Sequence, residues 1–411
     1  MSACGCDGTD LLPVEEAIAH LLQRVPAAPA VQQLRLEKAL GRVLAQDIRS
    51  PVQLPAWDNS AMDGYALRAV DLPAEGGYLP VSGRIAAGDG ALQPLPAGQA
   101  VRIFTGAPLP AGADTVVPQE RCRSEGAGVW LPAVTRGAHV RQQGEELRLG
   151  QPLLSAGIRL RPQELGLLAS VGLAEVPVYR RLRVCLLSSG NELREPGTAL
   201  APGQIYNSNR YCLGALLRGL GCEVHDYGVM ADELAASRDA LSLAASEWDV
   251  LITSGGVSVG EEDHLKQAIR ELGSLQLWRL AMQPGKPLAF GEVAGKPWIG
   301  LPGNPSAALV TALVVARPFL LKAQGLATVQ PNALQLPADF DWLKPNNRRQ
   351  YLRAGLQRSA DGQTRVVLHP QQSSAMLSAA CWADGLALVE CASTLHKGDP
   401  VQFLPFAELL Q

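Results

Sequence analysis

A glycine-rich loop in the second half of the chain has the residue types that bind a phosphate. It reads "ITSGGVSVGEEDH" over residues 252–264 and follows a short apolar run. Gly255 and Gly256 would let the backbone approach a ligand and turn its N–H groups toward an anion. Ser258 adds a hydroxyl. We therefore expect these three residues to bind an anionic substrate.

The three acids that end this loop have two interpretations. Glu261, Glu262 and Asp263 stand where the next helix should begin, and acids there complement the helix dipole. Alternatively, a carboxylate, best Asp263, binds a divalent cation that bridges to a phosphate, because magnesium sites commonly combine one or two carboxylates with substrate oxygens. We assign Glu261 and Glu262 to the dipole and predict the metal role for Asp263.

Two other turns resemble each other in plan, since "PGKPLAF" and "LPGNPSAAL" each set a Pro-Gly turn beside an expected strand. Lys286 in the first turn offers a positive charge to a phosphate or oxyanion, or is a solvated surface lysine. In the second, Asn304 and Pro305 open a long helix as its cap and first turn, which could be helix punctuation alone.

Two more acids end expected strands, Glu192 in "SSGNEL" and Asp232 in "GVMADE". With Asp263 they would place three carboxylates on one rim beside the phosphate loops, which indicates metal-dependent chemistry on a phosphate or phosphoanhydride. The chain has no GxxxxGK[ST] and no GxGxxG motif, which disfavours a P-loop ATPase and a dinucleotide dehydrogenase. Its scattered histidines make no evident Ser-His-Asp arrangement.

The first half of the chain contains acids in loops that are unusual for plain linkers. "PAWDNSAMDGYAL" carries Asp58 and Asp63 beside Trp57 and Met62. "RQQGEEL" adds Glu145 and Glu146. "RIFTGAPLP" contributes a Thr-Gly turn. Each of these signals is weak alone, because acids in turns usually face water.

The elements that must position these loops are clearest after Arg183, where apolar strand patterns alternate with helical ones. Such alternation predicts a parallel sheet with helices on both faces, whose ligands bind at the carboxyl ends of the strands. Residues 51–145 and 327–411 are instead rich in Pro, Gly and short apolar runs, which indicates two small β-rich units. Residues 11–46 favour helix, with a second helical pattern over 34–48.

Composition bounds the class of protein. A length of 411 residues implies two to four domains, and 47% apolar with 18% charged residues describes a globular protein. The net charge of −3 gives no electrostatic case for nucleic acid. We see neither a signal peptide nor a membrane span, so we expect a cytoplasmic protein with reduced cysteines. Cys4 and Cys6 are best explained as part of a mobile tail rather than a metal site.

Seven motifs in order resemble the molybdopterin molybdenumtransferase family, which comprises MoeA-type proteins and the E domain of gephyrin. They are "DNSAMDGYA", "TGAPLPAGAD", "GEE", "GQIYNSN", "ITSGGVSVGEEDH", "PGKPLAFG" and "GLPGNPSAA". Any one motif is weak, but seven in this order are highly specific. The resemblance runs from about residue 10 to the end of the chain.

The resemblance implies a multidomain α/β and β fold. A helical domain I would be built from two segments, residues 10–50 and 146–180, with a small β-rich domain II inserted at 51–145. Domain III, residues 181–326, would be a three-layer α/β molybdopterin-binding domain with a mostly parallel sheet, and domain IV, residues 327–411, a β barrel.

The implied reaction takes adenylylated molybdopterin and molybdate as substrates. The phosphoanhydride is hydrolysed, AMP leaves, and molybdenum is placed on the dithiolene with assistance from magnesium or a similar divalent ion. The family forms homodimers whose active cleft lies between subunits, which would explain the acids in the N-terminal loops. Further implied partners are the molybdopterin adenylyltransferase and molybdoenzyme chaperones, with no nucleic acid and no membrane.

The resemblance assigns roles residue by residue. Catalytic roles fall on Asp58, Thr105, Glu192, Asp232, Asp263 and Lys286. Substrate binding falls on Pro302, Pro305, Arg353 and Ser373 in addition to the glycine-rich loop. Metal ligation falls on Asp263, Glu192, Asp232 and Glu146.

Three positions depart from the family pattern. Glu146 replaces an aspartate, Asn191 stands where the family usually has an acid, and Gln283 stands where it usually has a lysine. We predict that Asn191 and Gln283 are a paired exchange that keeps the net charge of one cleft, which requires them to lie within about a Debye length. The alternatives to the enzyme are a non-catalytic molybdopterin-binding or scaffold protein, and a molybdopterin adenylyltransferase.

Overall fold

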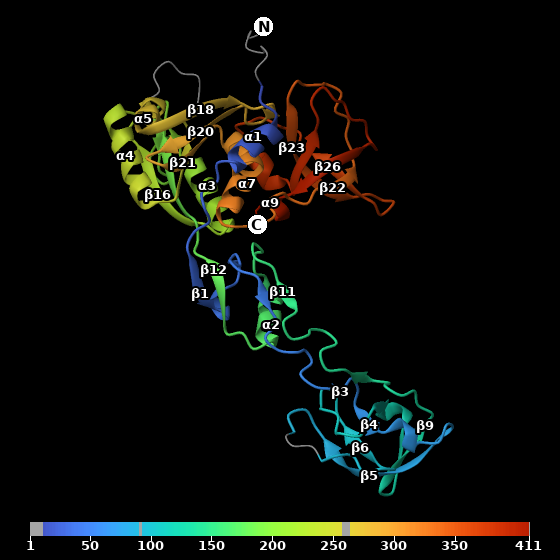
Figure 1. Ribbon diagram of the computed structural model, residues 1–411. Coiled ribbons are helices and arrows are strands. Elements are labelled where there is room, and N and C mark those ends of the chain that lie inside the picture. The colour runs from blue at the N-terminus through green and yellow to red at the C-terminus, as the bar shows by residue number, and fades with distance from the viewer. Residues whose placement is uncertain (1–10, 90–92, 257–263, 411) are drawn as a thin grey trace.

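The computed structural model describes residues 11–89, 93–256 and 264–410. The chain is elongated, with an α/β unit and a C-terminal sheet side by side at one end and a small separate sheet at the other (Figure 1). A middle region of short strands joins the two ends. The acid-rich loops and the described start of the glycine-rich loop, at Gly255 and Gly256, therefore belong to opposite ends of the molecule.

The α/β unit contains a six-stranded sheet with helices on both faces. Its order is β16 (Glu223–Met230), β13 (Arg183–Ser189), β17 (Val250–Ser254), β21 (Lys296–Leu301), β20 (Pro287–Val293) and β18 (Gly273–Arg279). The first four strands are parallel, and β20 and β18 continue the sheet antiparallel. The predicted alternation and mostly parallel sheet are confirmed.

Strand β13 shows why three layers form. Val184 and Leu186 pack into the core with helix α3 (Ser208–Gly219), whereas Cys185 and Leu187 pack into a separate core with α4 (Leu234–Glu247) and α5 (His264–Leu272). Successive side chains of a strand point to opposite faces, so an unbroken apolar strand must be covered on both sides.

The longest helix runs from Pro305 to Ala323. It consists of α6 (Pro305–Thr311), a π-helical turn at Ala312–Ala316 and α7 (Arg317–Ala323). The helix is long and apolar enough to cross a membrane, but 83% of its most apolar window is buried inside the protein. Its apolar surface is thus buried in the core, where α1 (Val14–Leu22) packs against it.

The middle region corrects one prediction. The expected helix over 34–48 is wrong: the segment holds the end of β1 (Val31–Arg35), a short 3₁₀ turn and the start of β2 (Ile48–Arg49). β1 pairs with β12 (Glu175–Tyr179), and β2 with β11 (Pro152–Leu154). The leucines at four-residue steps do not form one buried face, because Leu44 is buried while Leu40 is 56% exposed. Pairing with a distant strand determines the structure of this segment instead.

Domain I was therefore predicted to be more helical than the structure is. Within residues 31–49 and 152–179, α2 (Pro162–Ser170) accompanies the two strand pairs. Helix α1, at residues 14–22, belongs to the core of the α/β unit instead.

The small separate sheet has six strands. In order they are β7 (Thr115–Pro118), β4 (Gly64–Leu67), β6 (Ala100–Ile103), β5 (Gly76–Ile85), β9 (Gly128–Pro132) and β8 (Arg123–Glu125). Beside it, β3 (Asn59–Ser60) pairs with β10 (Val140–Arg141). This unit matches the β-rich character expected for 51–145.

The C-terminal sheet also has six strands. They are β19 (Met282–Gln283), β23 (Arg349–Arg358), β25 (Gly385–Val389), β26 (Pro400–Pro405) and β22 (Leu334–Pro337), with β24 (Thr364–Leu368) also on β23. A bridge joins Ala338, just after β22, to Val366 of β24. Helices α8 (Leu377–Trp382) and α9 (Phe406–Leu409) flank this sheet. The closed barrel and the four domain boundaries stay predictions.

Candidate active site

A cavity of about 890 Å³ lies at the carboxyl ends of β13, β17 and β21. The C-terminal unit closes it from the other side through the segment at 372–375. The predicted site residues that line it are Glu192, Gly255, Lys286, Pro302, Pro305 and Ser373. The expectation that the loops after the strands converge on one crevice is thus met for these residues.

Two helix N-termini face the cavity. Helix α3 begins after Asn207, whose side chain accepts a hydrogen bond from Arg210 N at 3.2 Å. The long helix begins at Pro305, and Asn304 before it donates from Nδ2 to Ser374 Oγ at 3.3 Å. Helix N-termini carry a partial positive charge, so both ends favour an anion in the cavity.

The charged side chains among the described lining residues are Lys286, Arg348 and Glu192. Two cations against one carboxylate add to the bias toward anions. The turn that carries Lys286 is closed by a hydrogen bond from Leu280 N to Lys286 O at 2.7 Å. Gly285 in this turn has φ +111°, and a Cβ there would lie 2.2 Å from Thr311 Oγ1, so a glycine is required.

Close packing also requires the glycines after β17. Gly255 has φ +89°, and a Cβ would lie 2.5 Å from Ser189 O at the end of β13. Gly256 has φ +67°, and a Cβ would lie 2.7 Å from Leu265 Cδ2. Only glycine fits such backbone, which brings neighbouring strand ends together at the cavity.

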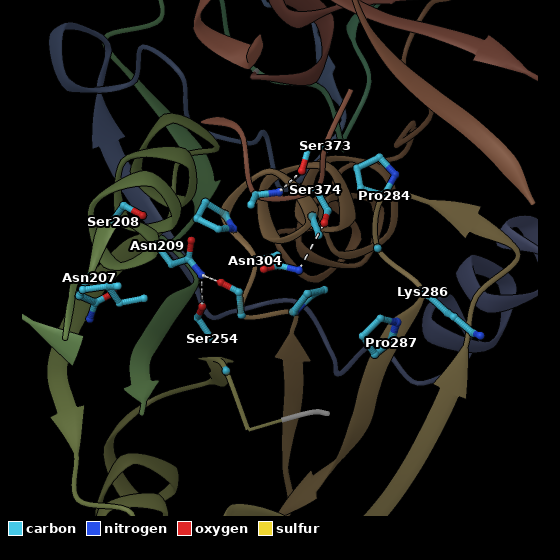
Figure 2. Close-up of a pocket in the computed structure, with 18 of the residues that line it drawn as sticks. Asn207, Ser208, Asn209, Ser254, Pro284, Lys286, Pro287, Asn304, Ser373 and Ser374 are labelled. Atoms are coloured by element: carbon cyan, nitrogen blue, oxygen red, sulfur yellow. Dashed lines mark hydrogen bonds between the residues drawn. The ribbon is translucent and has the colours of Figure 1, made fainter. Parts of the chain in front are cut away.

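A buried amide ties two of the loops together. Asn209 donates from Nδ2 to Ser254 Oγ at 2.7 Å and to Gly303 O at 2.8 Å. Figure 2 shows Asn209 pointing toward Ser254, with Lys286 and Pro287 on the other side of the cavity. All three partners line the cavity, and both Asn209 and Ser254 are buried.

Arg353 lies behind the cavity rather than on its wall. It is fully buried, and it donates from Nη2 to Ser373 O at 3.2 Å. Its backbone N donates to Gln372 Oε1 at 2.9 Å, and Gln372 Nε2 donates back to Arg353 O at 2.9 Å. Burial lowers the pKa of Arg353 to about 10. In this chain Arg353 supports the segment that carries Gln372 and Ser373.

Of the predicted metal ligands, the structure describes Glu192, Asp232 and Glu146, and these three are not gathered in one place. Glu192 is exposed at the cavity rim, and Asp232 is exposed without lining the cavity. Asp263 lies outside the described residues, as do Ser258, Glu261 and Glu262, and also Cys4 and Cys6. Within the described ranges no group of three His, Cys, Asp or Glu residues could hold a metal ion.

Asp58, Thr105 and Glu146 lie at or near the small sheet, away from the cavity of the same chain (Figure 1). Asp58 Oδ1 accepts from Gln143 N at 2.7 Å. Thr105 donates from N and from Oγ1 to Asp63 Oδ1, at 2.7 Å each. These two bonds lower the pKa of the Asp63 carboxyl. Asp58, Thr105 and Glu146 are exposed.

Several lining residues were assigned no role in the site from the sequence. They are Asn207, Ser208, Asn209, Asn304, Gln372 and Ser374. For "NSN", the available signal was its place in the motif "GQIYNSN". The polar run at 371–374 offered none, because its place in the cavity depends on how the C-terminal unit packs.

The two departures at Asn191 and Gln283 lie near this cavity in different ways. Gln283 lines it and accepts at Oε1 from Asn346 Nδ2 at 2.9 Å. Asn191 is exposed and immediately precedes Glu192 on the rim. The paired exchange stays a prediction.

Three family models match successive parts of the chain. The MoeA N-terminal region (domain I and II) matches residues 12–172, a probable molybdopterin binding domain matches 185–322, and the MoeA C-terminal region (domain IV) matches 335–406. The described cavity is lined from the second and third of these ranges.

Whole proteins give the same assignment. A molybdopterin molybdenumtransferase of Haemophilus influenzae is 37% identical over 404 residues, which cover 97% of this chain and 100% of the relative. Molybdopterin molybdenumtransferase 2 of Mycobacterium tuberculosis is 40% identical over 339 residues, covering 79% and 83%. The crystal structure of a molybdopterin biosynthesis MoeA protein from Pyrococcus horikoshii OT3 superposes with a TM-score of 0.83 at 26% identity, covering 96% of this chain and 100% of that one.

Proposed function

The chain belongs to the molybdopterin molybdenumtransferase (MoeA) family, and from that premise we propose that it inserts molybdenum from molybdate into adenylylated molybdopterin and releases AMP. The observation that carries the proposal is the cavity at the strand ends. It combines Lys286, Arg348 and two helix N-termini, which suit the phosphates and the oxyanion of these substrates.

The cavity residues divide by the chemistry of their atoms. Lys286 and the hydroxyls of Ser254 and Ser373 would bind phosphate or molybdate oxygens. The glycine backbone at 255–256, Pro302 and Pro305 would shape the wall. Arg353 would fix the position of Ser373 from behind.

The cavity offers a divalent cation one described carboxylate, together with the phosphates of the substrate. Glu192 is the one carboxylate among the described lining residues, and magnesium is often held by one or two carboxylates together with substrate phosphates. Asp232, Asp263 and Glu146 remain proposed ligands, with Glu146 contributed across the cleft. Such an ion would neutralise charge on the phosphoanhydride.

A second copy of the chain would complete the site. Asp58 and Thr105 adjoin β3 and β6 at the end of the molecule that holds the small sheet, Glu146 lies between β10 and β11, and all three are exposed. A homodimer that brings this end of one subunit to the cavity of the other would unite the two sets of groups. The domain boundaries at 50/51, 145/146, 180/181 and 326/327, and the cytoplasmic location, belong to the same proposal, as do transient contacts with the adenylyltransferase and molybdoenzyme chaperones.

One assay separates this function from its alternatives. The protein is incubated with adenylylated molybdopterin, molybdate and magnesium, and separately with ATP and free molybdopterin. We expect AMP release together with active cofactor in the first mixture. Binding without AMP release would indicate a scaffold, and ATP consumption in the second mixture would indicate an adenylyltransferase.

A further inference from the structure

The orientation of the Asn209 amide is fixed by its neighbours. The Gly303 carbonyl can only accept, so the atom 2.8 Å from it must be the nitrogen Nδ2. The opposite orientation would set two acceptor oxygens against each other. The same nitrogen lies 2.7 Å from Ser254 Oγ, so Ser254 accepts this hydrogen bond.

This fixes the polarity of the Ser254 hydroxyl. Ser254 Oγ accepts the hydrogen bond from Asn209 Nδ2, so the one hydrogen of the hydroxyl is not used in that bond. No described residue accepts the Ser254 hydrogen, and the residue lines the cavity at the end of β17. The hydroxyl is therefore left to donate toward whatever anion enters.

The same amide also sets the spacing of two loops. Ser254 ends β17, and Gly303 lies between β21 and the long helix. A Cβ on Gly303 would be 3.9 Å from Gly255 Cα, so the two backbones run close together. Asn209 reaches both from the first turn of α3, 45 and 94 residues away in sequence.

We propose that Asn209 is a positioning residue, which holds the loops after β17 and β21 together and directs the Ser254 hydroxyl to donate to a phosphate oxygen of the substrate. The identity of that substrate rests on the proposed function. The polarity itself does not, so inorganic pyrophosphate serves as a second probe for the phosphoanhydride.

The test uses Asn209→Asp, which keeps the shape and reverses the polarity. Its carboxylate would accept the Ser254 hydrogen and withdraw it from the ligand, and it would also lose the hydrogen bond to the Gly303 carbonyl. Losing a hydrogen bond to a charged ligand should weaken binding about 10- to 100-fold. Asn207→Asp is the matched control, because it adds the same charge to the cavity wall and retains the oxygen that caps α3. We expect a smaller loss there, from charge alone.

A double-mutant cycle with Ser254→Ala shows whether Asn209 acts through the serine. Ser254→Ala alone should weaken binding by about 10-fold and leave Asn209 bonded to Gly303. In that background the effect of Asn209→Asp should shrink, because contacting residues couple, and any loss beyond that of the Asn207→Asp control would measure the missing bond to the Gly303 carbonyl. Two outcomes would overturn the proposal. One is full additivity of the losses in binding free energy caused by Asn209→Asp and Ser254→Ala, and the other is an equal loss of affinity in Asn209→Asp and the Asn207→Asp control.

The measurements are equilibrium binding of adenylylated molybdopterin and of pyrophosphate to the full-length protein, with thermal unfolding as the folding check. Binding of pyrophosphate but not of the pterin nucleotide would contradict the proposed function, and the cycle on pyrophosphate would still decide the role of Asn209. If the unmodified protein binds neither probe, both proposals are wrong. If Asn209→Asp unfolds, an unchanged affinity in Ser254→Ala would overturn the inference.

Discussion

The cavity and the acid-rich end of the chain differ in how their polar groups are held. At the cavity, Asn209 and Ser254 are buried and bonded to one another, and the turn at Gly285 and the loop at Gly255 and Gly256 are packed so closely that glycine is required. At the other end, Asp58, Thr105 and Glu146 are exposed. A buried network holds a binding surface ready, whereas exposed side chains are not fixed in this way. On the proposed function, the cavity residues of one chain form a binding wall, and Asp58, Thr105 and Glu146 form a reactive wall that works with the cavity of a second chain.

The largest effect is expected from Asp58→Asn. The amide keeps an oxygen for Gln143 N, so the local fold should survive. If Asp58 acts on the bound substrate across the dimer, AMP release should fall by about 100-fold or more, while the affinity for adenylylated molybdopterin stays within about 2-fold. Parallel losses in turnover and affinity would break the division between binding wall and reactive wall.

Lys286→Ala should show the reverse pattern. Removing a charge-assisted contact from the cavity should weaken binding of the pterin nucleotide or molybdate about 10- to 100-fold. Lys296→Ala is the matched control, because Lys296 begins β21 and the cavity lies at the other end of that strand. This variant should bind normally. Isothermal titration of both variants measures the difference, and similar affinities for the two would remove Lys286 from the binding wall.

Gly255→Ala tests whether the cavity is packed as tightly as the glycines suggest. The new Cβ would meet Ser189 O in a backbone region unfavourable for alanine, at a cost of about 1–3 kcal/mol. We expect a lower melting temperature and about a 10-fold loss of affinity. Gly295→Ala is the control, because Gly295 has φ +78° and a Cβ there would meet no atom within 4 Å. This substitution adds backbone strain without a clash and should leave affinity unchanged. Unchanged affinity in Gly255→Ala would show that the loop adapts.

The smallest effect concerns Asp63 at the exposed end. Hydrogen bonds from Thr105 lower its folded pKa, so its stabilising contribution is present above the unfolded pKa and is lost as pH falls through the folded pKa. Thr105→Val removes the hydroxyl bond and retains the backbone one. The carboxyl pKa of Asp63, followed by NMR, should therefore rise part of the way toward its unfolded value, and the acid-side pH dependence of stability should become shallower. An unchanged Asp63 pKa would show that the Thr105 hydroxyl is not a significant partner.

The sequence predicted the cavity end of the fold better than the middle. Strands β13, β17 and β21 are mostly apolar and buried, so local pattern and tertiary environment agree. The segment 34–48 failed because Leu44 is buried by pairing beside a distant strand, which no local spacing reports.

Site residues divide in the same way. Lys286 and Pro302 lie in motifs of the family, and the resemblance also assigned Glu192 and Ser373, so these residues could be predicted. Asn209 lies in the motif "GQIYNSN", but its role could not be predicted, because that role depends on reaching Ser254 and Gly303 from another element. The packing of Arg353 behind the 372–375 segment is likewise a property of the folded C-terminal unit.

The central claim, that the binding wall of one subunit meets the reactive wall of another, is tested most directly by mixing one variant impaired in turnover with one impaired in binding, assayed at a substrate concentration well below the Kd of the binding variant. Asp58→Asn and Lys286→Ala chains, tagged differently, are unfolded and refolded together so that dimers form at random. Half of the dimers would be mixed, each with one intact site of two, so AMP release should recover to about a quarter of the unmodified protein's rate. Purified mixed dimers that remain as inactive as their parents would contradict the account.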